Sequence, residues 1–523
     1  MSTDKYATND SRRGIIKSTT IISLGTLSSR ILGFIRDIII AKLLGTASGA
    51  DSFFVAFRIP NLFRDLVGEG ATNSALVPVF SEYEAKKEKE ELWNFVNVFL
   101  VLSLMVLSAI TLLGMIFAPL IVRSIAPGFI VEPGKLATTI HLTRIMFPYL
   151  ILIGLTAYSM GMLYTFRSFV SPAFSPCLLN VAMIVAAVIA IKTKQDPLFC
   201  LAVSVLVGGA LQLAVQIRPL IKKGIKLQRP QSLSHPGARK VGQLLLPRLF
   251  GSAIYQLNIF IDTFCASLSM IVGQGGVAAI YYANRIIQFP MGIFSIALAS
   301  AILPSMAGFA ARNNIDSLKK TLSFSLKNII FLLLPISVFL VVLAVPITRI
   351  FFERGEFNEY STRITSMALL FSAVGLVSFG GAKIMVTAFH ATQDTATPAW
   401  VGFWCLLINT VFNFSLMGPL KIGGIALASS IASTVNFLVL FSIMNKKIQG
   451  LSAGFLHYFL KIFLASALMG LAVWEIWEHG VMVRELSRLV FAMAAGFLVF
   501  IFACFLLKVE QVGEVLRLIS KKK

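Results

Sequence analysis

Charged side chains interrupt two long apolar stretches in the first part of the chain. The first stretch, residues 28–45, reads SSRILGFIRDIIIAKLLG and carries Arg30, Arg36 and Asp37. The second stretch, residues 50–71, reads ADSFFVAFRIPNLFRDLVGEGA and carries the charged residues Asp51, Arg58, Arg64, Asp65 and Glu69. Each arginine or aspartate placed in a bilayer costs roughly 2.5–3.5 kcal/mol on insertion scales. Such residues are therefore expected where they face a hydrated cavity, a partner or an anionic ligand.

The spacing of these charges follows the turn of a helix. Arg30 and Asp37 are seven residues apart, which places them on one helical face. Asp51, Arg58 and Asp65 are separated by the same interval. A face that alternates acid, base and acid is poorly suited to lipid contact. It fits the wall of a hydrated cavity, in which the aspartates help to hold the arginines.

A further arginine, Arg285, lies in a later apolar stretch that reads YYANRIIQFPMG. The planar guanidinium group binds phosphate in a bidentate manner. Arg30, Arg58 and Arg285 therefore predict a binding site for a phosphorylated or otherwise anionic substrate. The alternative is that arginines reach lipid head groups or form internal salt bridges. Arg36 and Arg64 lie near the ends of their stretches and fit this alternative.

A second polar group predicts an ion site. Asp262 follows an asparagine by one helical turn, Asn409 and Asn413 share a face, and Ser429 begins the polar run SSIAST. Carboxylate, amide and hydroxyl oxygens are ligands that hard cations accept. Asp262, Asn409, Asn413 and Ser429 could together hold a sodium ion. The alternative is hydrogen bonding between helices, which is common for asparagine and serine in membranes.

The composition is that of a polytopic membrane protein. Hydrophobic residues make up 57% and charged residues 13% of the 523 residues, whereas soluble domains have about 25% charged residues. Runs of about 20 apolar residues can span a bilayer. We count fourteen such runs, at residues 17–43, 50–80, 92–122, 138–165, 170–192, 197–218, 241–270, 277–305, 321–348, 361–390, 398–417, 422–444, 455–477 and 486–507.

The net charge of +22 is better explained by the excess of lysine and arginine in cytoplasmic loops than by nucleic-acid binding. These residues concentrate near 86–89, 218–240, 312–320 and 446–447 and at 521–523. With the N-terminus placed inside, all of these segments fall on the cytoplasmic side. Both termini are therefore expected in the cytoplasm.

A weak internal repeat suggests two halves. Residues 55–81 and 282–306 both place Arg-Ile near the start and a proline soon after. In both segments a second proline follows the arginine by about 20 residues. Repeated halves with proline-broken helices are typical of transporters. We expect an all-α protein with one lobe in 1–220 (spans 1–6), a second in 221–450 (spans 7–12), and two further spans with a basic tail in 451–523.

No catalytic signature accompanies these features. The chain contains no HExxH, GxSxG or P-loop pattern. A membrane enzyme such as a polyprenyl-phosphate transferase would need an acid, base or metal cluster. The sequence therefore favours a transporter over an enzyme.

Several motifs carry a family resemblance. They are SRILGFIRD, DSFFVAFRIPNLFRDLVGEGA followed by LVPVF, LTRIMFPYL, SPAFSPCLLN, YYANRIIQFPMGIF, FERGEF and QDTATP. Their order and spacing resemble the MviN/MurJ family, the bacterial lipid II flippases of the multidrug/oligosaccharidyl-lipid/polysaccharide exporter superfamily. The resemblance extends from residue 17 to about residue 440.

The resemblance implies a fourteen-helix fold in the bacterial cytoplasmic membrane, with two six-helix lobes in a V around a cationic cavity. Spans thirteen and fourteen would line a groove for a lipid tail. The substrate would be lipid II, moved from the inner to the outer leaflet by alternating access. The resemblance implicates the membrane potential, and in some members also sodium, in driving this movement. Membrane lipids and the cell-wall synthesis machinery are the expected partners. Residues implied at the substrate site are Arg30, Arg36, Asp37, Asp51, Arg64, Glu69 and Arg285.

Three positions depart from the family pattern. Asp65 replaces the second of two basic residues, Asn284 replaces an aspartate before Arg285, and Asn413 replaces an acidic sodium ligand of some members. The changes weaken the case for sodium and leave the cationic cavity intact. A flippase for another polyprenyl-linked oligosaccharide is the nearest alternative. A multidrug cation antiporter is less consistent, because its cavity should be acidic.

Overall fold

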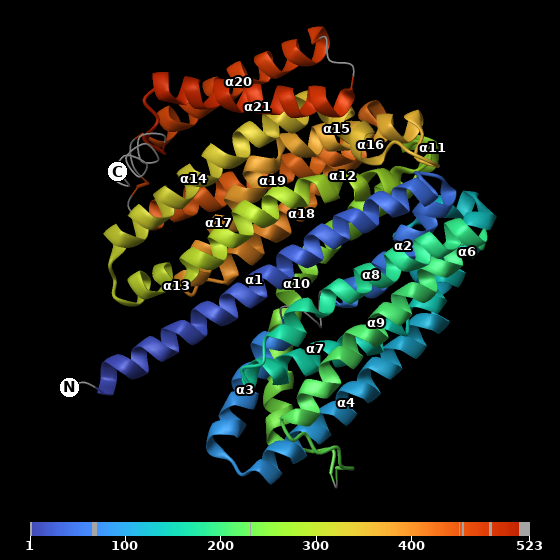
Figure 1. Ribbon diagram of the computed structural model, residues 1–523, viewed down its shortest axis with the longest axis vertical. Helices are drawn as coiled ribbons and strands as arrows, with labels where there is room; N and C mark the ends of the chain where they lie inside the picture. Colours follow the sequence, from blue (N-terminus) through green and yellow to red (C-terminus); the bar gives the residue numbers. More distant parts are fainter. Residues whose placement is uncertain are drawn as a thin grey trace. The chain divides into compact units, whose positions relative to one another are not determined.

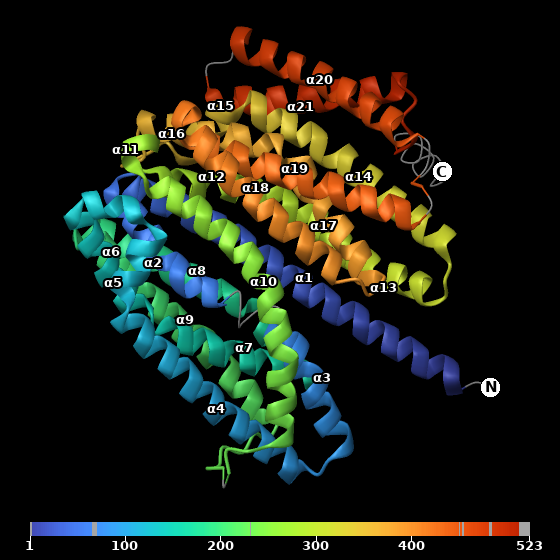
Figure 2. The same ribbon diagram turned by 180° about the vertical axis from the view of Figure 1, so that it is seen from behind.

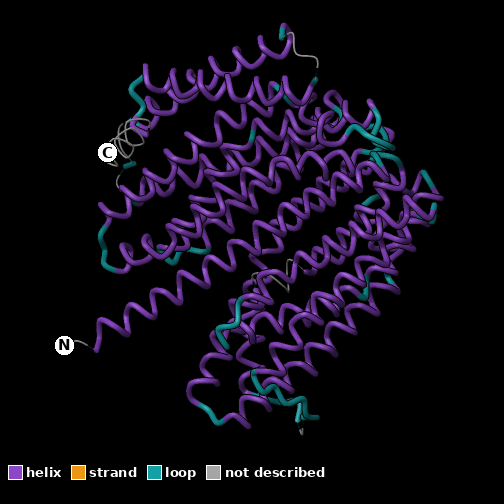
Figure 3. Tube along the Cα trace, viewed as in Figure 1, coloured by secondary structure: helices purple, strands orange, loops and turns teal. Residues whose placement is uncertain are grey.

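The computed structural model describes residues 3–64, 71–230, 232–448, 450–451, 454–480 and 484–511. Every regular element in these ranges is a helix (Figure 3), as the sequence predicts. The chain divides into two compact units, Met1–Gln256 and Leu257–Lys523. The division falls within one long helix, later than the boundary expected at residue 220. The expected lobe boundaries stay a prediction.

The first unit is built from nine helices and the first part of a tenth, within the described residues. Their bounds are α1 (Thr3–Leu44), α2 (Ser48–Arg64), α3 (Ala71–Lys86), α4 (Lys89–Ile116), α5 (Ala118–Ile125), a 3₁₀ turn (Pro127–Val131), α6 (Pro133–Met146), α7 (Tyr149–Thr165), α8 (Val170–Thr193), α9 (Pro197–Lys222) and α10 (Pro236–Ser267). The start of α9 shows how the sequence sets a boundary: Asp196 accepts a hydrogen bond from the Leu198 amide at 3.0 Å, and Pro197 occupies the first helical position.

Close helix packing positions α1, which carries Arg30 and Arg36. Helix α1 runs alongside α8 (Figure 1). Gly25 lies against the backbone of Ala173 on α8, and a Cβ added at Gly25 would stand 2.7 Å from the Ala173 carbonyl carbon. Only glycine allows this approach, since the clash would be with backbone rather than with a flexible side chain.

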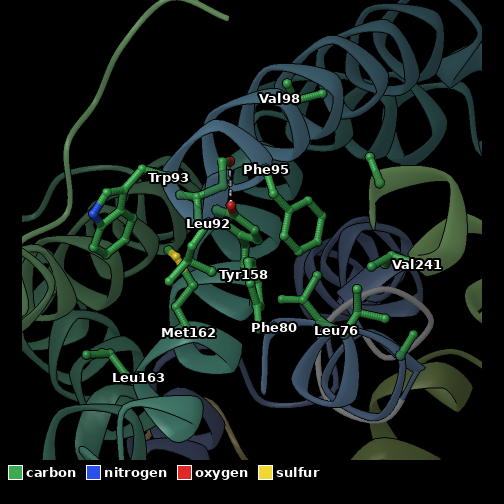
Figure 4. Packing of buried hydrophobic residues seen from close by; sticks show 14 of the residues in the cluster. Leu76, Phe80, Leu92, Trp93, Phe95, Val98, Tyr158, Met162, Leu163 and Val241 are labelled. Carbon is green, nitrogen blue, oxygen red and sulfur yellow. Dashed lines mark hydrogen bonds between the residues drawn. The ribbon is translucent and has the colours of Figure 1, made fainter. Parts of the chain in front are cut away.

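A hydrophobic core holds α3, α4, α7 and the first part of α10 together. Phe80 of α3, Phe95 of α4 and Tyr158 of α7 pack with Val241 of α10 in one buried cluster (Figure 4). The Tyr158 hydroxyl donates to the Val96 carbonyl at 2.6 Å, so its polar group is satisfied inside the cluster. The first part of α10 therefore belongs to the core of the first unit.

The second unit begins within α10 and contains the remaining helices. Their bounds are α11 (Ser269–Val272), α12 (Gly276–Pro290), a π-helical segment (Met291–Ile296), α13 (Ala297–Ala311), α14 (Ile315–Val342), α15 (Ala344–Phe352), α16 (Glu359–Val374), α17 (Leu376–Ala391), α18 (Ala396–Leu420), α19 (Ile422–Lys447), α20 (Phe455–His479) and α21 (Glu485–Leu506). Helices α18 and α19 pack together, as do α20 and α21 (Figure 2). Pro290 precedes the π-helical segment, where the regular hydrogen-bond ladder changes.

Ten helices, with α6–α7 and α12–α13 each taken as one, are long and apolar enough to cross a membrane within the described residues. Helices α16 and α17, bent by 47°, would add an eleventh span. The protein is thus a multi-pass membrane protein. The three other expected spans, 17–43, 50–80 and 241–270, correspond to α1, to α2 with α3, and to α10. The total of fourteen stays a prediction.

We predict that Gly25→Ala weakens the packing of α1 on α8. The added methyl group meets backbone, so the helices must separate, at a cost of about 1–3 kcal/mol. The midpoint of thermal unfolding in detergent should fall by several degrees. Gly134→Ala is the control, since a Cβ at Gly134 meets no atom within 4 Å. Equal midpoints for the two variants would contradict the prediction.

Candidate functional site

Arg36 and Asp37 form a buried ion pair on α1. The exposed fractions are 4% for Arg36 and 0% for Asp37. The Arg36 Nη2 and Nε atoms donate to Asp37 Oδ1 at 2.7 and 2.9 Å. Asn180 of α8 accepts from Arg36 Nη1 at 3.0 Å and donates to the Ser29 carbonyl at 3.0 Å. Arg36 is therefore fixed in the first unit and largely neutralised by its neighbour.

Arg30 and Arg58 are different, because both are only half-buried, on α1 and α2 respectively. Arg64 is the last residue of α2, and its side chain lies outside the described part of the structure. Asp65 and Glu69 also lie outside the described residues. The predicted roles of Arg64 and Glu69 therefore stay predictions.

Asp51 forms a second buried ion pair with a residue that the sequence did not single out. Asp51 Oδ2 accepts from Lys135 Nζ of α6 at 2.9 Å, and both side chains are 2% exposed. The ammonium group also lies 4.3 Å from the centre of the Phe129 ring. A buried carboxylate of this kind is tolerated because its charge is compensated and hydrogen-bonded.

Arg285 of α12 is half-buried and held by neutral groups on its own helix. Its Nη2 atom donates to the Tyr281 hydroxyl at 2.7 Å, and Nη1 donates to Gln288 Oε1 at 3.4 Å. The guanidinium carbon lies 4.8 Å from the centre of the Tyr281 ring. These contacts orient the guanidinium without cancelling its charge.

The structure brings the residues of the predicted ion site together around Asp262. Asp262 Oδ1 accepts from the amides of Asn409 and Asn413, each at 3.0 Å, and Oδ2 accepts from the Ser429 hydroxyl at 2.9 Å. Asn258 Oδ1 accepts from Asn409 at 3.2 Å. The cluster joins α10, α18 and α19 within the second unit.

The donor set is compatible with a monovalent cation. It offers one carboxylate, amide oxygens and a hydroxyl, and Asn413 Oδ1 is buried without a hydrogen-bond partner among the described residues. No group of three or more histidine, cysteine, aspartate or glutamate side chains that could hold a metal occurs in the ranges that the structure describes. Carboxylate, amide and hydroxyl oxygens of this kind suit a hard cation such as sodium better than a transition metal.

Three neighbours of these residues were missed by the sequence reasoning. Asn180 ends the motif SPAFSPCLLN, and Tyr281 begins the motif YYANRIIQFPMGIF. The signal that could have identified them was a polar group inside an apolar stretch. Lys135 lies just before the expected span 138–165, and nothing in its local sequence links it to Asp51. In the polar run SSIAST, Ser430 follows Ser429 directly but does not bind Asp262. Its hydroxyl donates instead to the Phe371 carbonyl of α16 at 2.7 Å.

Comparison with known proteins identifies the family. The family model described as lipid II flippase MurJ matches residues 40–493. A probable lipid II flippase MurJ from Buchnera aphidicola subsp. Acyrthosiphon pisum is 32% identical over 93% of this chain and 96% of that protein. The lipid II flippase MurJ of Burkholderia cenocepacia is 32% identical over 88% of this chain and 90% of that protein.

Solved structures agree with this assignment. A lipid II flippase MurJ structure in an inward closed conformation matches with a TM-score of 0.79 and 26% identity, covering 92% of this chain and 98% of that one. A multidrug resistance MATE family transporter in an inward-facing conformation matches with a TM-score of 0.68 and 18% identity, covering 80% and 94%, and shares the fold alone. Because the family model matches residues 40–493, which are most of the chain, this protein belongs to the lipid II flippase MurJ family.

Proposed function

We propose that this protein moves lipid II, an undecaprenyl-pyrophosphate-linked peptidoglycan precursor, from the inner to the outer leaflet by alternating access. The observation that carries the proposal is the division of the charged residues into two groups. Asp37 and Asp51 are buried in ion pairs, whereas Arg30, Arg58 and Arg285 are only half-buried. Accessible guanidinium groups in otherwise apolar helices suit a pyrophosphate ligand.

The two groups have different tasks in this proposal. Arg30, Arg58 and Arg285 contact the pyrophosphate. Arg36 and Asp37 hold α1 against α8 through Asn180, so they support the site rather than bind the ligand directly. The chain makes and breaks no covalent bond in this scheme, so it acts as a transporter and not as an enzyme.

The finer architecture belongs to the same proposal. It has fourteen spans, six in each of two lobes (1–220 and 221–450), and spans thirteen and fourteen within 451–523, which line a groove for the lipid tail. Both termini lie in the cytoplasm of a bacterial cell, and the membrane is the inner one. The membrane potential provides the driving force. The cell-wall synthesis machinery uses the product on the outer face.

Sodium is proposed to bind at Asp262. Asp262, Asn409, Asn413 and Ser429, which the hydrogen bonds bring together, would hold the ion through carboxylate, amide and hydroxyl oxygens.

We predict that Arg30→Ala and Arg285→Ala each abolish flipping while the protein still folds. Lipid II should accumulate on the inner face when either variant replaces the native protein in a flippase-depleted cell. Arg312→Ala is the control, because Arg312 packs on Phe309 outside the proposed site, and it should complement fully. Full complementation by both arginine variants would contradict the proposal.

For Asp51, we predict that charge balance matters more than the carboxylate itself. Lys135→Met alone should lower the free energy of unfolding by about 3–5 kcal/mol, because it leaves a buried charge uncompensated. The double variant Asp51→Asn with Lys135→Met should recover most of this loss and retain flipping. A stable double variant without flipping would instead assign the Asp51 carboxylate a direct role in transport.

For the ion, we predict that replacing sodium by potassium slows flipping in vesicles, and that sodium raises the thermal unfolding midpoint of the purified protein. Asp262→Ala should remove both effects. Asp316→Ala, an exposed acid at the start of α14, serves as the control. If the native protein shows neither effect, sodium is not the coupling ion.

A further inference from the structure

The FERGEF motif, residues 352–357, forms a tight turn for which the proposed transport scheme gives no role. The turn joins α15 to α16 in the second unit. Glu353 Oε2 accepts from Thr362 Oγ1 at 2.6 Å and from Arg349 Nε at 3.3 Å. Gly355 has a φ of +61°, a conformation that favours glycine. The turn is thereby tied to the helices on either side of it.

The two phenylalanines of the motif enclose a tyrosine of α12. Phe352 and Phe357 are 0% and 1% exposed, and their ring centres lie 5.3 and 5.5 Å from that of Tyr282. Tyr282 is itself 0% exposed. Edge-on and tilted contacts at these separations are favourable arrangements for aromatic rings. The turn therefore fixes the position of α12 at Tyr282.

Tyr281, which directly precedes Tyr282 on α12, contacts Arg285. The Tyr281 ring packs edge-on against Tyr282 with 5.8 Å between ring centres. Tyr281 then holds Arg285 in two ways, through its hydroxyl at 2.7 Å and through its ring face at 4.8 Å. A continuous line of contacts thus runs from the FERGEF turn through Tyr282 and Tyr281 to the guanidinium.

We propose that Tyr281 is the positioning residue for Arg285, and that the FERGEF turn is the rigid support of this pair. The inference rests on the proposed function, in which Arg285 contacts the pyrophosphate. Arginine loses considerable side-chain freedom when it binds, so a guanidinium already oriented binds an anion more tightly. A neutral phenol orients the group while keeping its charge for the ligand.

The test is a double-mutant cycle on the full-length protein in nanodiscs, with the affinity for purified lipid II as the measurement. Tyr281→Phe keeps the ring and removes the hydroxyl, and it should weaken binding about tenfold, the effect of losing one hydrogen bond to a charged group. In an Arg285→Ala background the same change should alter the affinity less than twofold. Tyr458→Phe is the control, since its hydroxyl donates to the Lys327 carbonyl of α14, and it should leave the affinity unchanged.

The support is tested by a second pair of variants. Phe357→Leu removes the ring contacts with Tyr282 and should weaken binding several-fold, again only when Arg285 is present. Phe331→Leu, which removes a comparable ring pair with Phe500, should not. These variants leave Tyr281 itself unchanged. They therefore test whether the FERGEF turn supports Arg285 even if Tyr281→Phe does not fold.

The outcomes separate the two proposals. If Arg285→Ala binds lipid II as the native protein does, the role proposed for Arg285 in transport fails, and the inference about Tyr281 fails with it. If Arg285→Ala loses affinity while Tyr281→Phe and Phe357→Leu do not, only the inference is overturned. Equal losses from Tyr281→Phe in both backgrounds also overturn it, because Tyr281 would then act without Arg285.

Discussion

A carboxylate buried in an apolar helical bundle is costly unless its charge is compensated or hydrogen-bonded, and the polar residues of this protein are arranged around that constraint. The buried Asp37 is held by Arg36 and the buried Asp51 by Lys135, whereas the half-buried Asp262 accepts from two amides and a hydroxyl. The Arg36–Asp37 pair lies within α1, whereas the donors to Asp51 come from α6 and those to Asp262 from α18 and α19. For Asp51 and Asp262 the helices must therefore pack closely enough to bring these donors within hydrogen-bond distance.

Small residues make this packing possible in the first unit. Gly25 lets α1 approach the backbone of α8 at Ala173, and Asn180 of α8 then reaches both Arg36 and the Ser29 carbonyl. The same pair of helices thus carries a steric contact and a polar one. The polar contact determines how α1 is rotated, because a helix turned by one residue would direct Arg36 away from Asn180. Rotation in turn decides which face presents Arg30.

The sequence alone predicts the helices and the membrane location, because each depends on a local pattern. It also singles out the arginines inside apolar stretches, whose role in binding stays a prediction. The partners of the charged residues depend on tertiary contacts. Lys135 is 84 residues from Asp51 and Asn180 is 144 residues from Arg36, so no spacing rule connects them. Asn409 and Asn413 were expected together because four residues separate them on a helix. Ser429 was expected at the ion site, but no sequence signal indicated that the adjacent Ser430 would face elsewhere, since the rotation of α19 places Ser429 at Asp262 and Ser430 at the Phe371 carbonyl.

The acids of the two units also differ in the kind of side chain that contacts them. The carboxylates of Asp37 and Asp51 each have a cationic partner, so their charge is already balanced within the first unit. Asp262 accepts hydrogen bonds from two amides and a hydroxyl, and such neutral donors stabilise a carboxylate without neutralising it. Arg285 donates to a phenol and to an amide oxygen, and such neutral acceptors orient a guanidinium without neutralising it. Neutral hydrogen-bonding partners thus preserve charge for a ligand, whereas ionic partners use it to stabilise the fold.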